Sequence, residues 1–272
     1  MIKNSPRAAF TLIEISIVLV IIGLISAGIA IGRSITESSA LQSTVADFEM
    51  YRQSVLSYKE KYGELPGDHS NATSLTSTDA GCANPTASDT ITSATCNGNG
   101  DGMIGDSTGN PLGAFTTYNE QLLVWQHLMN AGLIKGKYNG RRSAAASEIT
   151  PNINVPASKI NPLSKTTNAM FMLRYFPTNT FTTDYFKANY GHVFFFGAPG
   201  ASASNPLNGA ALNTEQAKSI DLKIDDGKPG LGKVLTSPLS VRPCPTTSVE
   251  TTAVYDSSIS GLACALIFIT GF

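Results

Sequence analysis

The sequence has few charged residues, and their two signs nearly cancel. Asp, Glu, Lys and Arg make up 14% of the chain, against roughly 25% in ordinary soluble domains, and the formal net charge is −1. This balance does not favour a nucleic-acid-binding protein or a polybasic membrane-surface protein. The chain also has only three histidines and one tryptophan, and it lacks HExxH, GxSxG, P-loop and dinucleotide-binding patterns, so no motif favours an enzyme. His127 and His192 are interpreted as packing or surface residues.

One segment near the N-terminus is apolar enough to cross a membrane. Residues 15–32 (ISIVLVIIGLISAGIAIG) run for 18 residues without a charge. Lys3 and Arg7 precede this run, so the N-terminus is expected to stay in the cytoplasm. A removable signal peptide cut after Gly28-Ile29-Ala30 is the alternative. Glu14 at the edge of the apolar run argues against it, because an unpaired carboxylate there costs a few kcal/mol and a discarded segment has no use for one.

Residues 7–14, RAAFTLIE, followed by the apolar run, resemble the processing site of type IV prepilins and type II secretion pseudopilins. The resemblance implies that a prepilin peptidase cuts between Ala9 and Phe10 and that the new amine of Phe10 is methylated. Residues 1–9 would then be the leader. The family usually has glycine at the position of Ala9, and this chain departs from that pattern.

Glu14 has a physical role in this resemblance. A buried carboxylate needs a partner, and cleavage before Phe10 creates a positive amine near the same membrane depth. The resemblance implies that Phe10 of an incoming subunit pairs with Glu14 of a docked subunit during assembly. Such a pair would also set the axial register between subunits.

A helical pattern continues beyond the apolar run. Apolar residues recur every three or four positions from Leu41 to Tyr62, which predicts an amphipathic helix ending near Gly63 and Pro66. A helix from Phe10 to Tyr62 would be about 80 Å long. The expected transmembrane half is 10–33 and the amphipathic half is 34–62.

Residues 63–272 are expected to form a globular pilin-like domain. Residues 67–118 show no sustained period and predict a long loop region, helices are expected at 118–134 and 214–220, and strands at 168–176, 191–197 and 262–269. The expected fold class is α+β, in which the long N-terminal helix packs on an antiparallel sheet with helical and loop insertions. Pro66-Gly67-Asp68 and residues 220–227 (IDLKIDDG) also resemble a subgroup of prepilin-like proteins.

All four cysteines follow the expected membrane segment. An even number in an exported domain favours disulfides, and three connectivities are conceivable. Cys82–Cys96 with Cys244–Cys264 is preferred because each bridge closes a short loop. Four free buried thiols are the alternative.

Residues 97–108, NGNGDGMIGDST, resemble the first half of a calcium-binding loop. The expected ligands are Asn97, Asn99 and Asp101, the backbone carbonyl of Met103, and Asp106 in place of the missing glutamate. With so few carboxylates, the affinity for Ca²⁺ would be roughly 0.1–1 mM. An ion-free Gly/Asn turn is the alternative. Asp221, Asp225 and Asp226 form a second acidic group, interpreted as a solvated surface or helix-end feature, with a second calcium site as the alternative.

Three functions are therefore compared. The first is a minor structural subunit of a pilus or pseudopilus, with other subunits, the prepilin peptidase, the inner-membrane assembly platform and lipid as partners. It would sit in the inner membrane with a periplasmic C-terminal domain before entering the filament. The second is a filament-tip or anchored binding module stabilised by calcium, and the third is a membrane-tethered periplasmic enzyme. Loss of Lys3 and Arg7 makes the mature chain more acidic, which does not favour nucleic acid as a partner.

Overall fold

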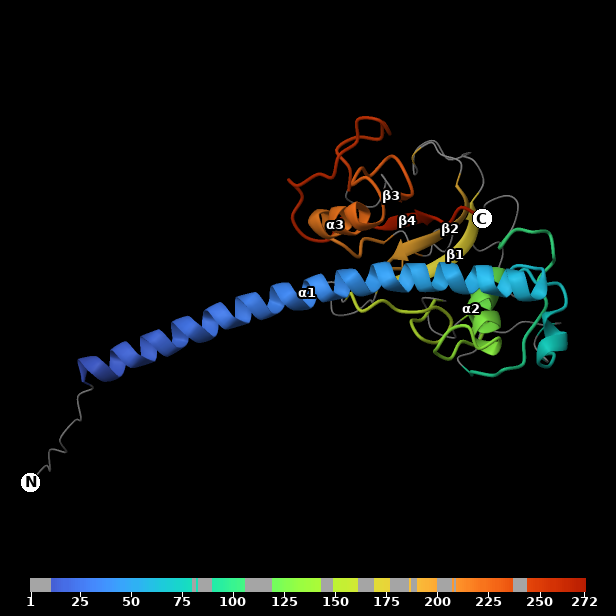
Figure 1. Ribbon diagram of the computed structural model, residues 1–272, viewed down its shortest axis with the longest axis horizontal. Helices are drawn as coiled ribbons and strands as arrows, with labels where there is room; N and C mark the ends of the chain where they lie inside the picture. Colours follow the sequence, from blue (N-terminus) through green and yellow to red (C-terminus); the bar gives the residue numbers. More distant parts are fainter. Residues whose placement is uncertain are drawn as a thin grey trace, which may run out of the picture. The chain divides into compact units, whose positions relative to one another are not determined.

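The fold is an α+β arrangement, seen in a computed structural model of the chain (Figure 1). The structure describes residues 11–79, 82, 90–105, 119–142, 149–160, 169–176, 186, 190–199, 207, 209–236 and 244–272. The helices are α1 (Leu12–Tyr62), the short 3-10 helix η1 (Ala72–Leu75), α2 (Glu120–Asn130) and α3 (Thr214–Ile224). The strands are β1 (Met170–Phe176), β2 (Gly191–Gly197), β3 (Val234–Thr236) and β4 (Leu266–Ile269).

Helix α1 contributes to two compact units, residues 1–40 and residues 41–272. In the second unit it buries one face, which consists of Leu41, Thr44, Phe48, Tyr51, Ser54, Val55 and Tyr58. These positions follow the three- and four-residue spacing of the amphipathic pattern. The helix ends where Gly63 adopts a positive φ of 83°, a conformation that favours glycine.

The four described strands form one antiparallel sheet in the order β1-β2-β4-β3. Val193 pairs with Ile269, and Leu235 pairs with Ile267. Every residue of β3 and nearly every residue of β1, β2 and β4 is buried, so the sheet lies inside the globular unit.

Aromatic side chains join α1 to the sheet and to α2. The ring of Phe48 stacks on Phe268 of β4 at 4.7 Å, and the ring of Tyr51 meets Phe171 of β1 at 5.4 Å. Tyr51 also contacts Trp125 of α2 edge-on at 5.1 Å. Aromatic pairs in these geometries add about 0.5–1.5 kcal/mol beyond the burial of their area. This aromatic layer is the core of the globular unit.

Several element boundaries differ from the expectations. The helix expected to reach residue 134 ends at Asn130, because Ala131 caps it and Gly132 adopts a positive φ of 72°. Helix α3 extends four residues past residue 220, and Asn213 caps it in a reciprocal capping box with Gln216. The expected strand 262–269 begins only at Leu266, and β3 was not anticipated.

Candidate functional site

Helix α1 begins with a local hydrogen-bonded cap that includes Glu14. The backbone N–H and the hydroxyl of Thr11 both donate to Oε2 of Glu14 at 2.8 Å. The backbone N–H of Glu14 donates back to the Thr11 hydroxyl at 3.3 Å. This is a Thr-x-x-Glu capping box, which satisfies donors at the helix start. Ala9 and Phe10 lie outside the described residues.

The first unit leaves its apolar side chains uncovered. Every residue from Thr11 to Ser39 is exposed. The large apolar side chains are Leu12, Ile13, Ile15, Ile17, Val18, Leu19, Val20, Ile21, Ile22, Leu24, Ile25, Ile29, Ile31 and Ile35. A soluble monomer rarely exposes so large an apolar surface. Helix α1 is long and apolar enough to cross a membrane, which fits a membrane-anchored protein.

In the loop expected to bind calcium, side-chain oxygens accept hydrogen bonds from backbone N–H groups. Oδ1 of Asn99 accepts from the N–H of Asp101, and Oδ1 of Asp101 accepts from the N–H of Met103, both at 2.8 Å. These residues therefore lie together. Oδ1 of Asn97 instead accepts from the N–H of Thr73 in η1 at 2.9 Å. Asp106 lies outside the described residues.

Two carboxylates that the sequence did not single out as ligands converge on this loop. Asp68 accepts from the N–H groups of Gly100, Asp101 and Gly102 at 2.8–3.0 Å. Glu120, in the first turn of α2, accepts from the N–H groups of Asn99 and Gly105 at 2.9 and 2.8 Å. Burial, followed by the charges of Asp68 and Asp101, raises the pKa of Glu120 to about 7.

The donor set of this loop fits a hard cation in part. Oxygen ligands and several neighbouring carboxylates suit Ca²⁺. Five loop N–H groups nevertheless point toward Asp68 and Glu120 and compete for their lone pairs. Asp68 and Glu120 both lie outside residues 97–108, so the pattern of the loop itself could not identify them.

The acidic residues at the end of α3 are not all solvated, which corrects the expectation. Asp221 is fully buried, whereas Asp225 is half-buried and Asp226 is exposed. One carboxylate oxygen from each of the three lies within 4.8 Å of the others. Oδ2 of Asp221 accepts from the hydroxyl of Tyr255 at 2.8 Å. The three residues lie at the helix end as expected, but Asp221 is not solvated because Tyr255 of segment 244–256 covers it, a contact that no local pattern predicts.

His127 and His192 are both buried and hydrogen-bonded. Nδ1 of His127 accepts from the N–H of Gly67 at 2.9 Å, and Nε2 donates to the carbonyl of Cys96 at 3.1 Å. Burial lowers the pKa of His127 to about 4, so the ring is neutral. His192 accepts from the N–H of Ile104 and donates to the carbonyl of Phe272. Both rings act as packing residues that tie loops together.

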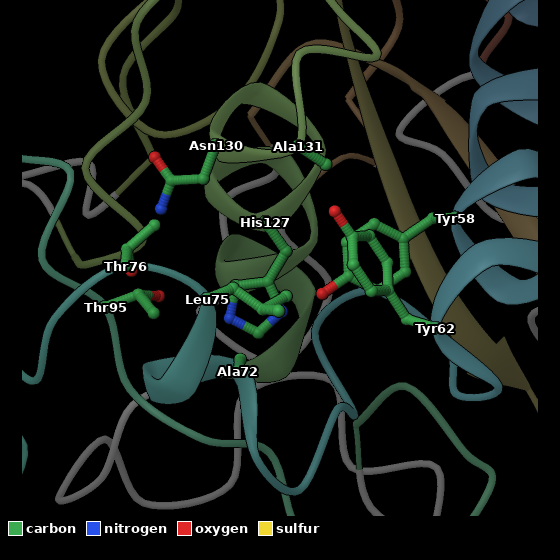
Figure 2. A pocket seen from close by; sticks show the side chains of 9 residues that line it. All are labelled: Tyr58, Tyr62, Ala72, Leu75, Thr76, Thr95, His127, Asn130 and Ala131. Atoms are coloured by element: carbon green, nitrogen blue, oxygen red, sulfur yellow. The ribbon is translucent and has the colours of Figure 1, made fainter.

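A small pocket lies beside His127 (Figure 2). It is lined by Tyr58, Tyr62, Ala72, Leu75, Thr76, Thr95, His127, Asn130 and Ala131, and its volume is about 90 Å³. Pockets for drug-sized ligands are about 300–1,000 Å³. Because both nitrogens of His127 already have partners, its ring provides no free base to this pocket.

Two disulfides fasten the globular unit. Cys82 bonds to Cys96 and Cys244 bonds to Cys264, the pairing that closes the two short loops. Cys264 precedes β4, and its backbone pairs with Leu212 before α3. Such bridges are typical of proteins in an oxidising compartment.

The comparisons with known proteins identify the N-terminal segment. Residues 4–30 match the family model described as the prokaryotic N-terminal methylation motif. Comparisons with curated proteins and with solved structures give no match. The match ends inside the apolar half of α1, and it includes Thr11 and Glu14, which form the cap of the helix. The chain thus carries the prepilin-type N-terminal methylation motif, consistent with the type IV pilin and pseudopilin family.

Proposed function

We propose that this chain is a structural subunit of a type IV pilus or a type II secretion pseudopilus. The observation that carries the proposal is the methylation motif at residues 4–30 leading into a helix whose apolar half is uncovered. Lipid covers that half before assembly, and the helices of other subunits cover it afterwards. The prepilin peptidase and the inner-membrane assembly platform are the other partners, and the globular unit faces the periplasm until the subunit enters the filament.

The proposed maturation uses residues at the start of α1. The peptidase cuts between Ala9 and Phe10, and the amine of Phe10 is methylated. Before assembly, the Thr11 cap supplies two hydrogen bonds to the Glu14 carboxylate, which reduces the free-energy cost of holding that charge near lipid. During assembly, the amine of an incoming Phe10 pairs with Glu14 of a docked subunit.

We further propose a minor rather than a major subunit. The compact unit at residues 41–272 exceeds the common domain size of about 100–150 residues. A filament built mainly of such units would have to accommodate this large globular unit at every position. A subunit present in few copies avoids that requirement.

The N-terminal mass of mature protein purified from membranes tests the maturation step. A chain that begins at methylated Phe10 is the expected result, and a chain that retains Met1 or begins near Ile31 would refute the proposal. Glu14→Ala tests the pairing: it should be cut normally but recovered in filaments at least tenfold less than the unaltered chain. Glu60→Ala is the control, because Glu60 is an exposed carboxylate on the same helix, far from the motif. Equal recovery of both variants would refute the pairing.

A calcium-stabilised binding module is the second candidate. The observation that favours it is the approach of Asp68 and Glu120 to the loop that contains Asp101. The module would use the same membrane anchor but would not need Glu14 for its activity. A tethered enzyme, the third candidate, predicts no cleavage at Phe10, so the mass measurement also tests it.

A further inference from the structure

We propose that Asp221, Asp225 and Asp226, here called the acidic cluster, form a pH-sensitive switch that fastens loop 225–233 and segment 244–256 to the end of α3. The cluster holds one extra proton in its closed form. Loss of that proton loosens the loop. This inference goes beyond the proposed function, because it concerns the surface of the globular unit and not its anchor.

The hydrogen bonds of the acidic cluster join three parts of the chain. The buried Asp221, on the last turn of α3, accepts from the N–H of Gly227 at 3.1 Å and from the Tyr255 hydroxyl at 2.8 Å. Asp226 accepts from the N–H of Lys228 at 2.9 Å, and Asp225 accepts from the N–H of Lys233. Each carboxylate therefore organises a different part of the same loop, and Asp221 also holds segment 244–256 through Tyr255.

The charged groups that act on Asp221 are negative. Asp225 and Asp226 are the charged neighbours that act on Asp221 from α3 and the loop, and Tyr255 is the titratable group that faces it from segment 244–256. Lys228 and Lys233 contribute backbone N–H groups. In the part of the chain that the structure describes, no lysine or arginine forms an ion pair with these three carboxylates. Three full negative charges within 4.8 Å would repel one another strongly, because Asp221 is shielded from water.

A shared proton relieves this repulsion. Burial, and then the charges of Asp226 and Asp225, raises the pKa of Asp221 to about 7, despite hydrogen bonds from Tyr255 and Gly227 that lower it. The same surroundings raise the pKa of Tyr255, so its hydroxyl remains a donor across the neutral range. Once the loop opens, water surrounds Asp221 and its pKa returns toward 3.8.

The sign of the pH dependence follows from the pKa of Asp221, which is about 7 in the closed form and returns toward 3.8 in the open form. An acid whose pKa is higher in the closed form favours closure when it is protonated, and this advantage is lost as pH rises from about 4 to about 7. The open fraction of loop 225–233 should therefore increase roughly 50-fold between pH 5 and pH 7. Above about pH 8 it should be constant, because both forms are then ionised.

Hydrogen exchange on the mature full-length chain in detergent micelles, with EDTA present throughout, tests the switch. Protection factors, corrected for the intrinsic pH dependence of exchange, are compared at pH 5, 7 and 8.5. We expect protection in peptides covering 225–233 to fall roughly 50-fold from pH 5 to pH 7, with no comparable fall in peptides covering α2. Constant protection in 225–233, or an equal fall in α2, would overturn the proposal.

Asp226→Asn supplies the second readout. The amide oxygen of the substituted side chain can still accept the bond from Lys228, but one negative charge is removed. The pH at which the loop loosens should therefore shift to lower values, and protection at pH 8.5 should rise. Glu215→Gln is the matched control, since Glu215 is an exposed carboxylate in the first turn of the same helix. Identical pH profiles for Asp226→Asn and Glu215→Gln would overturn the role of the acidic cluster.

Discussion

Removing the Cys82–Cys96 disulfide should destabilise the globular unit by about 3 kcal/mol. The bridge closes a loop of about 15 residues, and the chain-entropy relation gives about 3 kcal/mol for that length. The change is the double substitution Cys82→Ser, Cys96→Ser. Nearby native contacts should persist, because Thr95 still exchanges backbone bonds with Ser77 and Asp79. The loss of stability should therefore arise mainly from the greater conformational freedom of the unfolded chain.

The single tryptophan gives a direct assay of this prediction. Trp125 is fully buried against Tyr51, Tyr138 and Phe194, so its fluorescence should change when the core unfolds. For a folded unit of this size, 3 kcal/mol corresponds to a decrease in Tm of about 6–12 °C. Thermal unfolding of the full chain in detergent measures it. A decrease in Tm below about 2 °C would refute the entropy argument. A decrease above about 12 °C would show that the bridge also supports the native loop.

Three further outcomes are expected. Calcium at 5 mM should stabilise the chain by about 1.4 kcal/mol for a Kd of about 0.5 mM, and Asp101→Asn should remove the gain; identical melting with calcium and with EDTA would reject the site. In the folded protein the pKa of His127 is lowered from 6.5 to about 4. Its contribution of up to about 3 kcal/mol to the free energy of unfolding is therefore present above pH 6.5 and is lost as pH falls to 4. The stability difference between the unaltered chain and His127→Gln should shrink over that range, and a constant difference would contradict the assignment. Thr11→Val should weaken the start of α1 by about 1 kcal/mol and speed amide exchange in its first turn, whereas unchanged exchange would mean that the cap contributes nothing.

Periodicity predicted the elements whose side chains face one core. The spacing of Leu41, Phe48, Tyr51, Val55 and Tyr58 predicted the buried face of α1, and the aromatic run predicted β2 at residues 191–197. The helix expected at residues 214–220 is present as the first seven residues of α3. These features succeed because each depends on contacts that repeat along a short stretch of chain.

Features that depend on distant partners could not be predicted in this way. Strand β3 has three residues and is held by pairing with β4, so its own sequence carries little signal. Asp68 and Glu120 reach loop 97–105 from two separate segments. Asp221 is buried because Tyr255 folds over it. In each case the decisive contact joins residues that lie far apart in sequence.

The position of β4 has a consequence for the order of folding. This strand, the last of the four described strands in sequence, lies inside the sheet between β2 and β3, and the ring of Phe268 stacks on Phe48 of α1. Neither β2 nor β3 has its full set of sheet partners until residues 266–269 are available. The sheet therefore cannot be completed by pairing neighbours in sequence: residues 266–269 must enter between two earlier strands, so its closure is a long-range step that comes late in folding.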